Sequence, residues 1–237
     1  MSNGRLPFRY YSPARALQQK TGDESAGQRS FVHAAILGND ITYKIGMPGR
    51  HMAINSLAVL AAAQLAGADL VAAALALASF KPAAGRGVQT HLGLPQGAAT
   101  LIDESYNANP ASMAAALSVL GHAAVGPRGR RIAVLGDMLE LGPRGPELHR
   151  GLVAPVLANK VDLVFCCGPL MRNLWDALPS ARRGGYAESS TALESVVVGA
   201  LRAGDAVMVK GSLGSRMKVV VQALEKRFPA GGAFDER

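Results

Sequence analysis

Short apolar runs alternate with amphipathic stretches through the second half of the sequence, and this alternation limits the fold more than any other feature. We expect strands at residues 100–103, 131–135, 162–166, 185–187 and 206–210, and helices at residues 110–124, 146–158, 169–178, 191–203 and 215–228. Alternation of this length predicts an α/β fold, with a Rossmann-like, doubly wound and mostly parallel sheet that carries helices on both faces.

The stretch of residues 101–117 shows the pattern most clearly. An apolar run ends in the polar loop DESYNAN, and helical spacing follows, with Met113 and Leu117 four residues apart. Asn109 can cap this helix, and Pro110 suits its first position because the missing N–H costs nothing there. Ligands of open α/β sheets bind at the carboxyl ends of strands, so the loop can line a site, although many such loops only cap and turn.

Two further polar loops are expected at the same edge of the sheet. Residues 135–142, LGDMLELG, contribute acids, which a plain acidic turn explains equally well. Residues 210–217, KGSLGSRM, combine glycines with the cations Lys210 and Arg216, so backbone N–H groups and positive charge can converge on an anion. This loop therefore indicates an anionic ligand group.

Three further helix starts have candidate caps in the sequence. Asp69 can cap a helix expected at residues 70–79, Thr191 and Glu194 have the spacing of a capping box, and Ser215 can cap the last helix. His149 lies on the helix expected at residues 146–158, where a lone histidine is more often packing than catalysis.

The first part of the chain is organised differently. Residues 30–45 hold two β-type runs around a turn at residues 38–40, which predicts a hairpin. Residues 54–79 are apolar but interrupted by polar residues, which favours two packed helices over a membrane span. Residues 81–96 are rich in glycine and proline and indicate a domain boundary.

Composition narrows the function classes. The chain has 237 residues, is 49% hydrophobic and carries a net charge of +8, which suits an anionic substrate. The basic residues form no long run and no aromatic residues interleave with them, so nucleic-acid binding is unsupported. The cysteines, Cys166 and Cys167, are adjacent in an apolar run, which indicates buried free thiols in a reducing cytosol and no metal site. We expect no signal peptide and no membrane insertion.

The phosphate-binding fingerprints of common nucleotide enzymes are missing from these residues. The sequence contains no G-x-x-x-x-G-K-[ST] loop and no G-x-G-x-x-G loop. A generic Rossmann-like nucleotide enzyme is therefore disfavoured as an interpretation.

Several segments resemble one family in order and approximate spacing. DESYNANPASM resembles the signature loop of the Mur ligases, and within them of the MurF type. GRHMAINSLAVLAA is similar to the helix that approaches adenine in that family, although Met52 stands where a second asparagine is common. The loops LGDMLELG and KGSLGSRM and the linker AAGRGVQ are also similar. The resemblance covers residues 30–228 and implies an incomplete central ATPase domain at 1–80, a linker at 81–86 and a C-terminal domain at 87–237.

The resemblance also implies a reaction. Ligases of this type use ATP and magnesium to join D-alanyl-D-alanine to UDP-N-acetylmuramoyl-tripeptide through an acyl phosphate, in peptidoglycan precursor synthesis. The P-loop lysine and the magnesium ligands of the family would lie in an N-terminal part that these residues do not contain. We therefore expect a truncated or split ligase, inactive alone, monomeric and cytoplasmic, which a separate N-terminal fragment could complete. A non-catalytic binding module derived from such a domain is the alternative.

Site residues follow from the resemblance, while no catalytic residue is assigned. On the nucleotide side it implies His51 and Asn55 near adenine. It implies Arg86 near the phosphates and Asp103 at the ribose, with Glu104 as the alternative because neighbouring acids can align one position apart. On the dipeptide side it implies Ser105, Tyr106, Asn107, Asn109, Lys210, Ser212 and Arg216.

Overall fold

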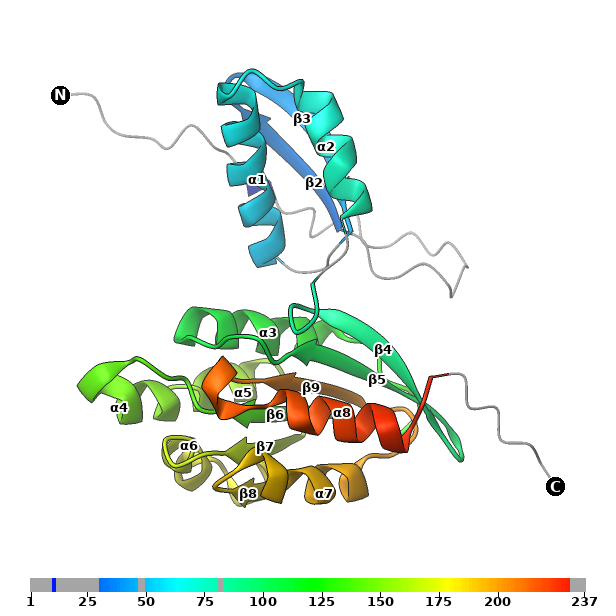
Figure 1. Cartoon of the computed structure of the whole chain (residues 1–237), viewed down its shortest axis with the longest axis vertical. Coiled ribbons are helices and arrows are strands. Elements are labelled where there is room, and N and C mark those ends of the chain that lie inside the picture. The colour runs from blue at the N-terminus through cyan, green and yellow to red at the C-terminus, as the bar shows by residue number, and fades with distance from the viewer. Residues whose placement is uncertain (1–9, 12–29, 47–49, 81–82, 231–237) are drawn as a thin grey trace. The chain divides into compact units, whose positions relative to one another are not determined.

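The chain falls into two compact units in a computed structural model, which describes residues 10–11, 30–46, 50–80 and 83–230. The units comprise Met1–Pro82 and Ala83–Arg237 (Figure 1). His51 lies in a helix, but its side chain is outside the described residues.

The first unit combines an antiparallel sheet with a helix pair. Its sheet has the order β1-β2-β3, and its helices pack on the sheet through a core that includes Ile36 of the sheet and Leu60 of a helix. The bounds are β1 Tyr10–Tyr11, β2 Ser30–Ile36, β3 Asn39–Ile45, α1 Arg50–Leu65 and α2 Leu70–Ser79. The hairpin is confirmed, but the turn predicted at residues 38–40 is wrong: Leu37 and Gly38, both at positive φ, close it. Such a backbone is typical of a two-residue hairpin turn.

Helix α2 begins as the sequence predicts. Asp69 accepts a hydrogen bond from the backbone N–H of Ala72 at 2.7 Å. The apolar stretch at residues 54–79 is confirmed as two helices, and no described helix is both long and apolar enough to cross a membrane.

The second unit contains, among the described residues, a six-stranded sheet with the order β4-β5-β9-β6-β7-β8. All neighbours run parallel except β4, which pairs antiparallel with β5 at one edge. The strands are β4 Val88–Leu94, β5 Gly97–Glu104, β6 Arg131–Gly136, β7 Leu163–Cys167, β8 Arg183–Ala187 and β9 Ala206–Lys210. The predicted fold class, a mostly parallel Rossmann-like sheet, is confirmed.

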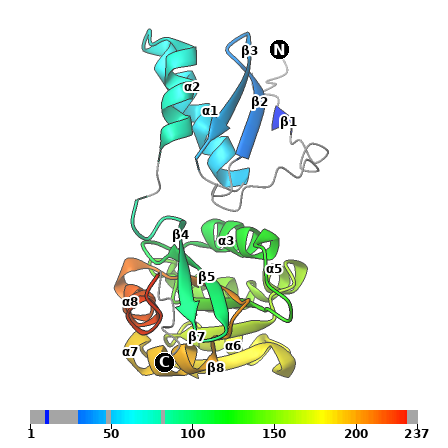
Figure 2. The same ribbon diagram turned by 90° about the vertical axis from the view of Figure 1, so that its right-hand side faces the viewer.

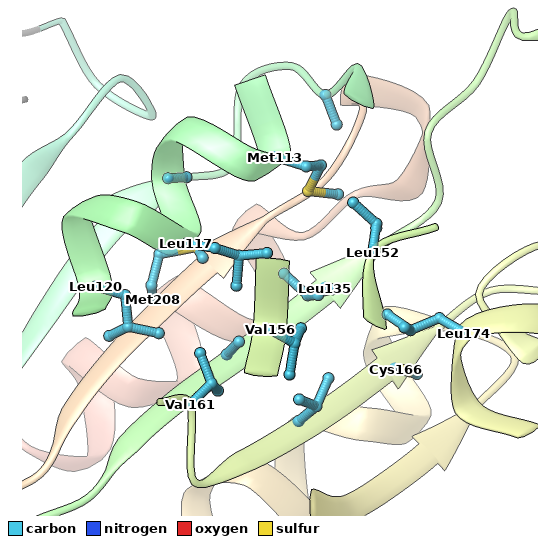
Figure 3. Close-up of a cluster of buried hydrophobic side chains, with 14 of the residues drawn as sticks. Met113, Leu117, Leu120, Leu135, Leu152, Val156, Val161, Cys166, Leu174 and Met208 are labelled. Carbon is cyan, nitrogen blue, oxygen red and sulfur yellow. The ribbon is translucent and has the colours of Figure 1, made fainter. Parts of the chain in front are cut away.

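Helices cover both faces of this sheet (Figures 1 and 2). Side chains of α3, α5 and α6 pack with Leu135 and Met208 on one face, as Figure 3 shows. Side chains of α7 and α8 pack with Val134 and Val209 on the other. Cys166 and Cys167 contribute to opposite cores, as alternation along a strand requires, and both are buried free thiols. The helices are α3 Pro110–His122, α4 Gly145–Arg150, α5 Val153–Ala158, α6 Arg172–Ala177, α7 Ser190–Ala200 and α8 Lys218–Arg227.

The division between the two units falls between Pro82 and Ala83, within the boundary region expected at residues 81–96, and β4 occupies 88–94 of that region. Three further local predictions are wrong. The single helix at 146–158 is two helices, because Pro155 would clash with the carbonyl of residue 151 in a continuous helix. Ser189, not Thr191, caps α7 by accepting from the N–H of Ala192. Ser215 caps no helix; it ends the 3-10 turn Leu213–Ser215, and α8 begins later.

Candidate functional site

Three polar loops meet at one edge of the sheet, as the sequence predicts. They follow β5, β9 and β6, which are neighbours in the sheet. Lys210, the last residue of β9, is in register with Glu104 on one side and with Leu135 on the other. The carboxyl ends of these parallel strands therefore bring the loops into direct contact.

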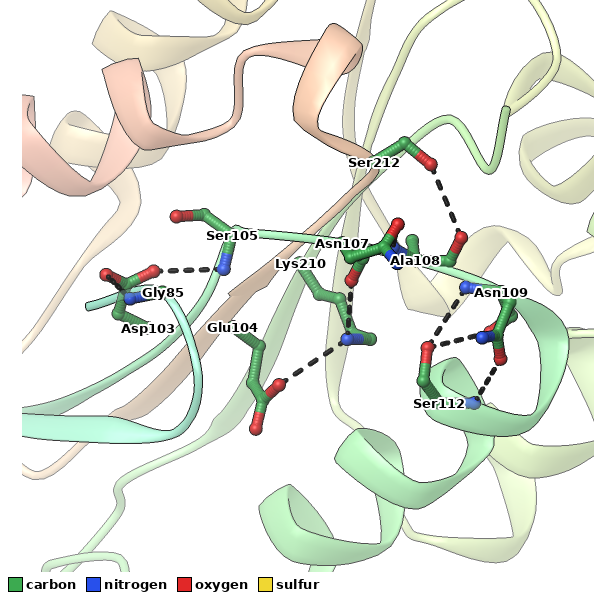
Figure 4. A network of polar contacts seen from close by, with 10 residues as sticks. All are labelled: Gly85, Asp103, Glu104, Ser105, Asn107, Ala108, Asn109, Ser112, Lys210 and Ser212. Carbon is green, nitrogen blue, oxygen red and sulfur yellow. Dashed lines mark hydrogen bonds and ion pairs between the residues drawn. The ribbon is translucent and has the colours of Figure 1, made fainter. Parts of the chain in front are cut away.

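The front half of the loop after β5 is tied to the segment that precedes β4 (Figure 4). The buried carboxylate of Asp103 accepts hydrogen bonds from the N–H groups of Gly85, at 3.1 Å, and Ser105, at 3.0 Å. The N–H of Tyr106 donates to the carbonyl of Gly85 at 3.1 Å. The guanidinium carbon of Arg86 lies 4.2 Å from the centre of the Tyr106 ring. Arg86 and Asp103 are thus brought close together.

The rear half of the same loop begins helix α3. The side-chain oxygen of Asn109 accepts from the N–H of Ser112 at 2.8 Å, and the Ser112 hydroxyl accepts from the N–H of Asn109 at 3.0 Å. This reciprocal capping box, with Pro110 in the first turn, confirms the predicted helix start. The side chain of Asn107 accepts from the N–H of Ala108. The asparagines therefore fix the path of the backbone here.

Lys210 joins the β9 loop to both halves of the β5 loop. Its buried Nζ donates to the carbonyl of Asn107 at 2.9 Å and lies 3.4 Å from a carboxylate oxygen of Glu104 (Figure 4). Burial lowers the pKa of Lys210, the nearby charge of Arg86 lowers it further, and the charge of Glu104 and its hydrogen bond oppose this change. The buried cation is thus engaged in holding the loops together.

Ser212 connects all three loops. Its hydroxyl donates to the carbonyl of Ala108 at 3.3 Å and accepts from the N–H of Leu139 at 2.9 Å. Its own N–H donates to the carbonyl of Asp137 at 3.0 Å. One small side chain therefore fixes the relative positions of the β5, β6 and β9 loops.

A cavity of about 350 Å³ lies where these loops meet. Its lining includes three of the predicted dipeptide residues, Asn107, Asn109 and Ser212. Ser105, Tyr106, Lys210 and Arg216 are not in that lining, and Arg216 is exposed in a left-handed conformation after the 3-10 turn. The lining consists of Asn107, Ala108, Asn109, Leu139, Glu140, Leu141, Ser212, Leu213 and Gly214.

Two buried polar residues, Asp137 and His149, make hydrogen bonds to the backbone near the cavity that the sequence did not predict. The carboxylate of Asp137 accepts from the N–H groups of Met171 at 2.8 Å and Leu170 at 3.3 Å. The pKa of Asp137 is raised by burial, and these two hydrogen bonds and the charge of His149 oppose the rise only in part. His149 is fully buried, as a packing residue would be; its Nε2 accepts from the N–H of Met138, and its Nδ1 lies 2.7 Å from the carbonyl of Gly145. Together they support the cavity wall that begins at Leu139.

The remaining predicted residues belong to the first unit. Asn55 is exposed on α1. No group of three or more histidine, cysteine, aspartate or glutamate side chains among the described residues is arranged to hold a metal ion.

Comparison with known proteins places these features in a family. The family model described as "Mur ligase, glutamate ligase domain" matches residues 91–213. The UDP-N-acetylmuramoyl-tripeptide–D-alanyl-D-alanine ligase of Bacillus subtilis is 30% identical over 196 residues, covering 81% of this chain and 42% of the relative. That of Escherichia coli is 34% identical over 189 residues, covering 76% and 38%. The chain thus spans about two fifths of the length of these relatives.

The fold is shared with solved structures of the same family. The MurF ligase of Thermotoga maritima, in complex with ADP, superposes with a TM-score of 0.67 at 23% identity. The match covers 84% of this chain and 43% of that one. At this identity the likeness supports the fold alone.

Proposed function

The chain belongs to the Mur ligase family, and we propose that it provides the part of a MurF-type ligase that positions D-alanyl-D-alanine for joining to UDP-N-acetylmuramoyl-tripeptide. The observation that carries the proposal is the meeting of three strand-end loops around one cavity, held by Lys210 and Ser212. We further propose that the ligase, once an N-terminal part completes it, acts as a monomer in the cytoplasm; the buried free thiols of this chain suit a reducing compartment.

The proposed reaction has two steps. The γ-phosphoryl group of ATP is transferred to the carboxylate of the tripeptide, which yields an acyl phosphate and ADP. The amine of the dipeptide, after losing a proton, attacks the acyl carbon, so that an amide forms and inorganic phosphate leaves. Phosphoryl transfer needs a lysine and magnesium to neutralise the developing charge, and we propose that a segment outside these 237 residues supplies them.

The cavity suits the dipeptide in size and chemistry. A volume of about 350 Å³ falls within the range of small-molecule pockets. Asn107 and Asn109 bring amide groups, and Glu140 brings a carboxylate that can pair with an ammonium group. In this proposal Ser212 borders the ligand, whereas Lys210 acts through the carbonyl of Asn107 and holds the wall in place.

On the nucleotide side, the second unit offers a cation and a carboxylate. Arg86 has no ion pair with any residue that the structure describes, and a guanidinium is well suited to phosphate. Each Asp103 oxygen accepts one N–H and keeps a further lone pair, so ribose hydroxyls can still donate to it. Asp103 is preferred to Glu104, which faces Lys210. His51 and Asn55 stay predictions for the adenine.

A chimera tests the proposal. The matching segment of the Bacillus subtilis ligase is replaced by this chain, and ADP release is measured with and without D-alanyl-D-alanine. We expect dipeptide-dependent release from the chimera and none from the isolated chain. The same chimera with Arg150→Ala, a change at an exposed position outside the cavity lining, should keep this dipeptide-dependent release and is the control for a substitution that does not touch the site. If calorimetry shows that the chain binds the dipeptide but the chimera has no turnover, the result would instead favour a non-catalytic binding module.

A further inference from the structure

The residues before β4 form a turn that glycine makes possible. The N–H of Arg86 donates to the carbonyl of Ala83 at 3.0 Å, and Gly85, the third residue of this turn, has φ of +74°. That position of a type II turn requires a positive φ. A Cβ at Gly85 would also lie 3.0 Å from the backbone N and the Cβ of Tyr106. The turn is therefore packed directly against the loop after β5.

Hydrogen bonds fix the backbone on both sides of Arg86. Gly85 donates to the Asp103 carboxylate and accepts from the N–H of Tyr106. Gly87 donates to the Asp103 carbonyl at 2.8 Å and starts the β4–β5 pairing. Rotation of the Arg86 side chain is thus the main conformational freedom that remains in this segment.

The Tyr106 ring removes much of that freedom. The guanidinium carbon of Arg86 lies 4.2 Å from the ring centre, well inside the range of a cation–π contact. Tyr106 is 45% exposed and is not in the lining of the cavity. The side chain therefore faces the Arg86 turn and not the proposed dipeptide pocket.

An aromatic partner orients an arginine without neutralising it. A carboxylate would occupy the N–H edge of the guanidinium and cancel its charge, whereas a ring contacts the flat face and leaves the edge free for a bidentate contact. No carboxylate of the described residues pairs with Arg86. The geometry is suited to an arginine that must bind an anion arriving from outside.

We propose that Tyr106 is a positioning residue that holds the guanidinium of Arg86 against its ring, with the N–H edge presented to a phosphate group. The phosphate part rests on the proposed function, while the stacked pair does not. Tyr106, which the family resemblance implied on the dipeptide side, would then serve the nucleotide side.

Nuclear magnetic resonance of the whole 237-residue chain tests the stacked pair. The ring current of Tyr106 should displace the side-chain resonances of Arg86 from ordinary arginine positions. We expect Tyr106→Phe to keep this displacement and Tyr106→Leu to abolish it. Phe31→Leu, which removes an exposed ring in contact with Lys44 in the first unit, is the matched control and should leave Arg86 unchanged. Arg86 resonances that are the same in Tyr106→Leu as in the wild type would overturn the proposal.

Titration with inorganic tripolyphosphate tests the role of the pair. The anion should shift the Arg86 Nε resonance, and Tyr106→Leu should weaken the apparent affinity roughly two- to fivefold, the range that exposed cation–π pairs give. Tyr106→Phe should keep the affinity of the wild type, because phenylalanine retains the aromatic ring that leucine lacks. Equal affinity in all three proteins would contradict the positioning role. A retained ring-current shift with no anion response at Arg86 would overturn the phosphate assignment of the proposed function and leave the stacked pair standing.

Discussion

The two units of this chain bury their apolar side chains to different extents. In the second unit the sheet is covered on both faces, and two separate cores enclose its side chains. In the first unit a single core lies between sheet and helices, while large apolar side chains stay exposed on α1 and α2. These exposed residues include Ile54, Val59, Leu65, Val71 and Leu75. Helices that are apolar on all sides are typical of elements covered on every side. We therefore expect the second unit to be stable by itself and the apolar surface of the first unit to favour association.

The largest expected effect concerns self-association. We expect the chain to associate through the first unit, and Val71→Glu with Leu75→Lys to reduce this strongly. The two positions are exposed and four apart on α2, so the new charges also pair favourably. Sedimentation velocity measures the outcome. The matched control is Val196→Glu, at an exposed position of α7 in the second unit. An equal reduction by the control would contradict association through the apolar surface of the first unit.

The second prediction compares one substitution in both units. Leu120 is fully buried on α3, and Leu75 is 68% exposed on α2. Leu120→Ala should lower the free energy of unfolding of the second unit by about 2–5 kcal/mol, because it leaves a cavity in a packed core. Leu75→Ala should change that of the first unit by no more than about 0.5 kcal/mol. Urea denaturation measures both; similar losses would mean that Leu75 is covered in solution.

The third prediction concerns the buried ion pair of the second unit. Lys210→Met leaves Glu104 without its partner and should destabilise the unit by about 3 kcal/mol, whereas Glu104→Leu with Lys210→Met should recover most of that loss. A double variant that is as unstable as the single one would contradict this account of Lys210.

The same pair predicts a pH dependence. Because the pKa of Lys210 is lowered in the folded protein, the unfolded chain binds more protons just below the ordinary value of 10.5. The stability of the wild type relative to the double variant should therefore rise with pH in that window and stay flat below it. Urea denaturation across the window measures this difference; a fall with rising pH would contradict the direction of the shift.

The smallest expected effects come from removing one helix cap in each unit. Asp69→Ala and Asn109→Ala each remove a side-chain acceptor and should destabilise α2 and α3 by about 0.5–2 kcal/mol. Hydrogen exchange should show the loss of protection in the altered unit only. Loss in both units after either substitution would show that they unfold together.

Local signals predicted much of the second unit. The strand Ala206–Lys210 and the start of α3 at Pro110 follow directly from apolar runs and a cap. The edge strand β4 was missed because one of its faces is exposed and Gly93 interrupts its short alternation. An edge strand presents only half of the apolar signal that a central strand gives.

The site was predicted only in part, because some of its contacts join distant residues. The loop at Asp103 and the cations of the β9 loop were visible as strand-end patterns. Asp137 was identified only as an acid in a turn, since its hydrogen-bond donors, Leu170 and Met171, lie 33 and 34 residues away. A carboxylate directly after a wholly buried strand is the signal that could have found it. The proposed role of Tyr106 on the nucleotide side depends on its contact with the turn at Gly85 and Arg86. The composition of its own loop does not reveal that contact.

We propose that the loop after β5 serves two ligands, the nucleotide through Asp103 and the dipeptide through the cavity held by Ser212. The most direct test measures both Michaelis constants in the Bacillus subtilis chimera. Ser212→Ala removes the hydroxyl that bridges Ala108 and Leu139, and Asp103→Ala removes the carboxylate at Gly85. We expect Ser212→Ala to raise KM for D-alanyl-D-alanine about two- to tenfold and that for ATP much less, since the net contribution of a hydrogen bond is about 0.5–1.5 kcal/mol. Asp103→Ala should do the reverse. Equal changes in both constants for both variants would contradict the division of the loop.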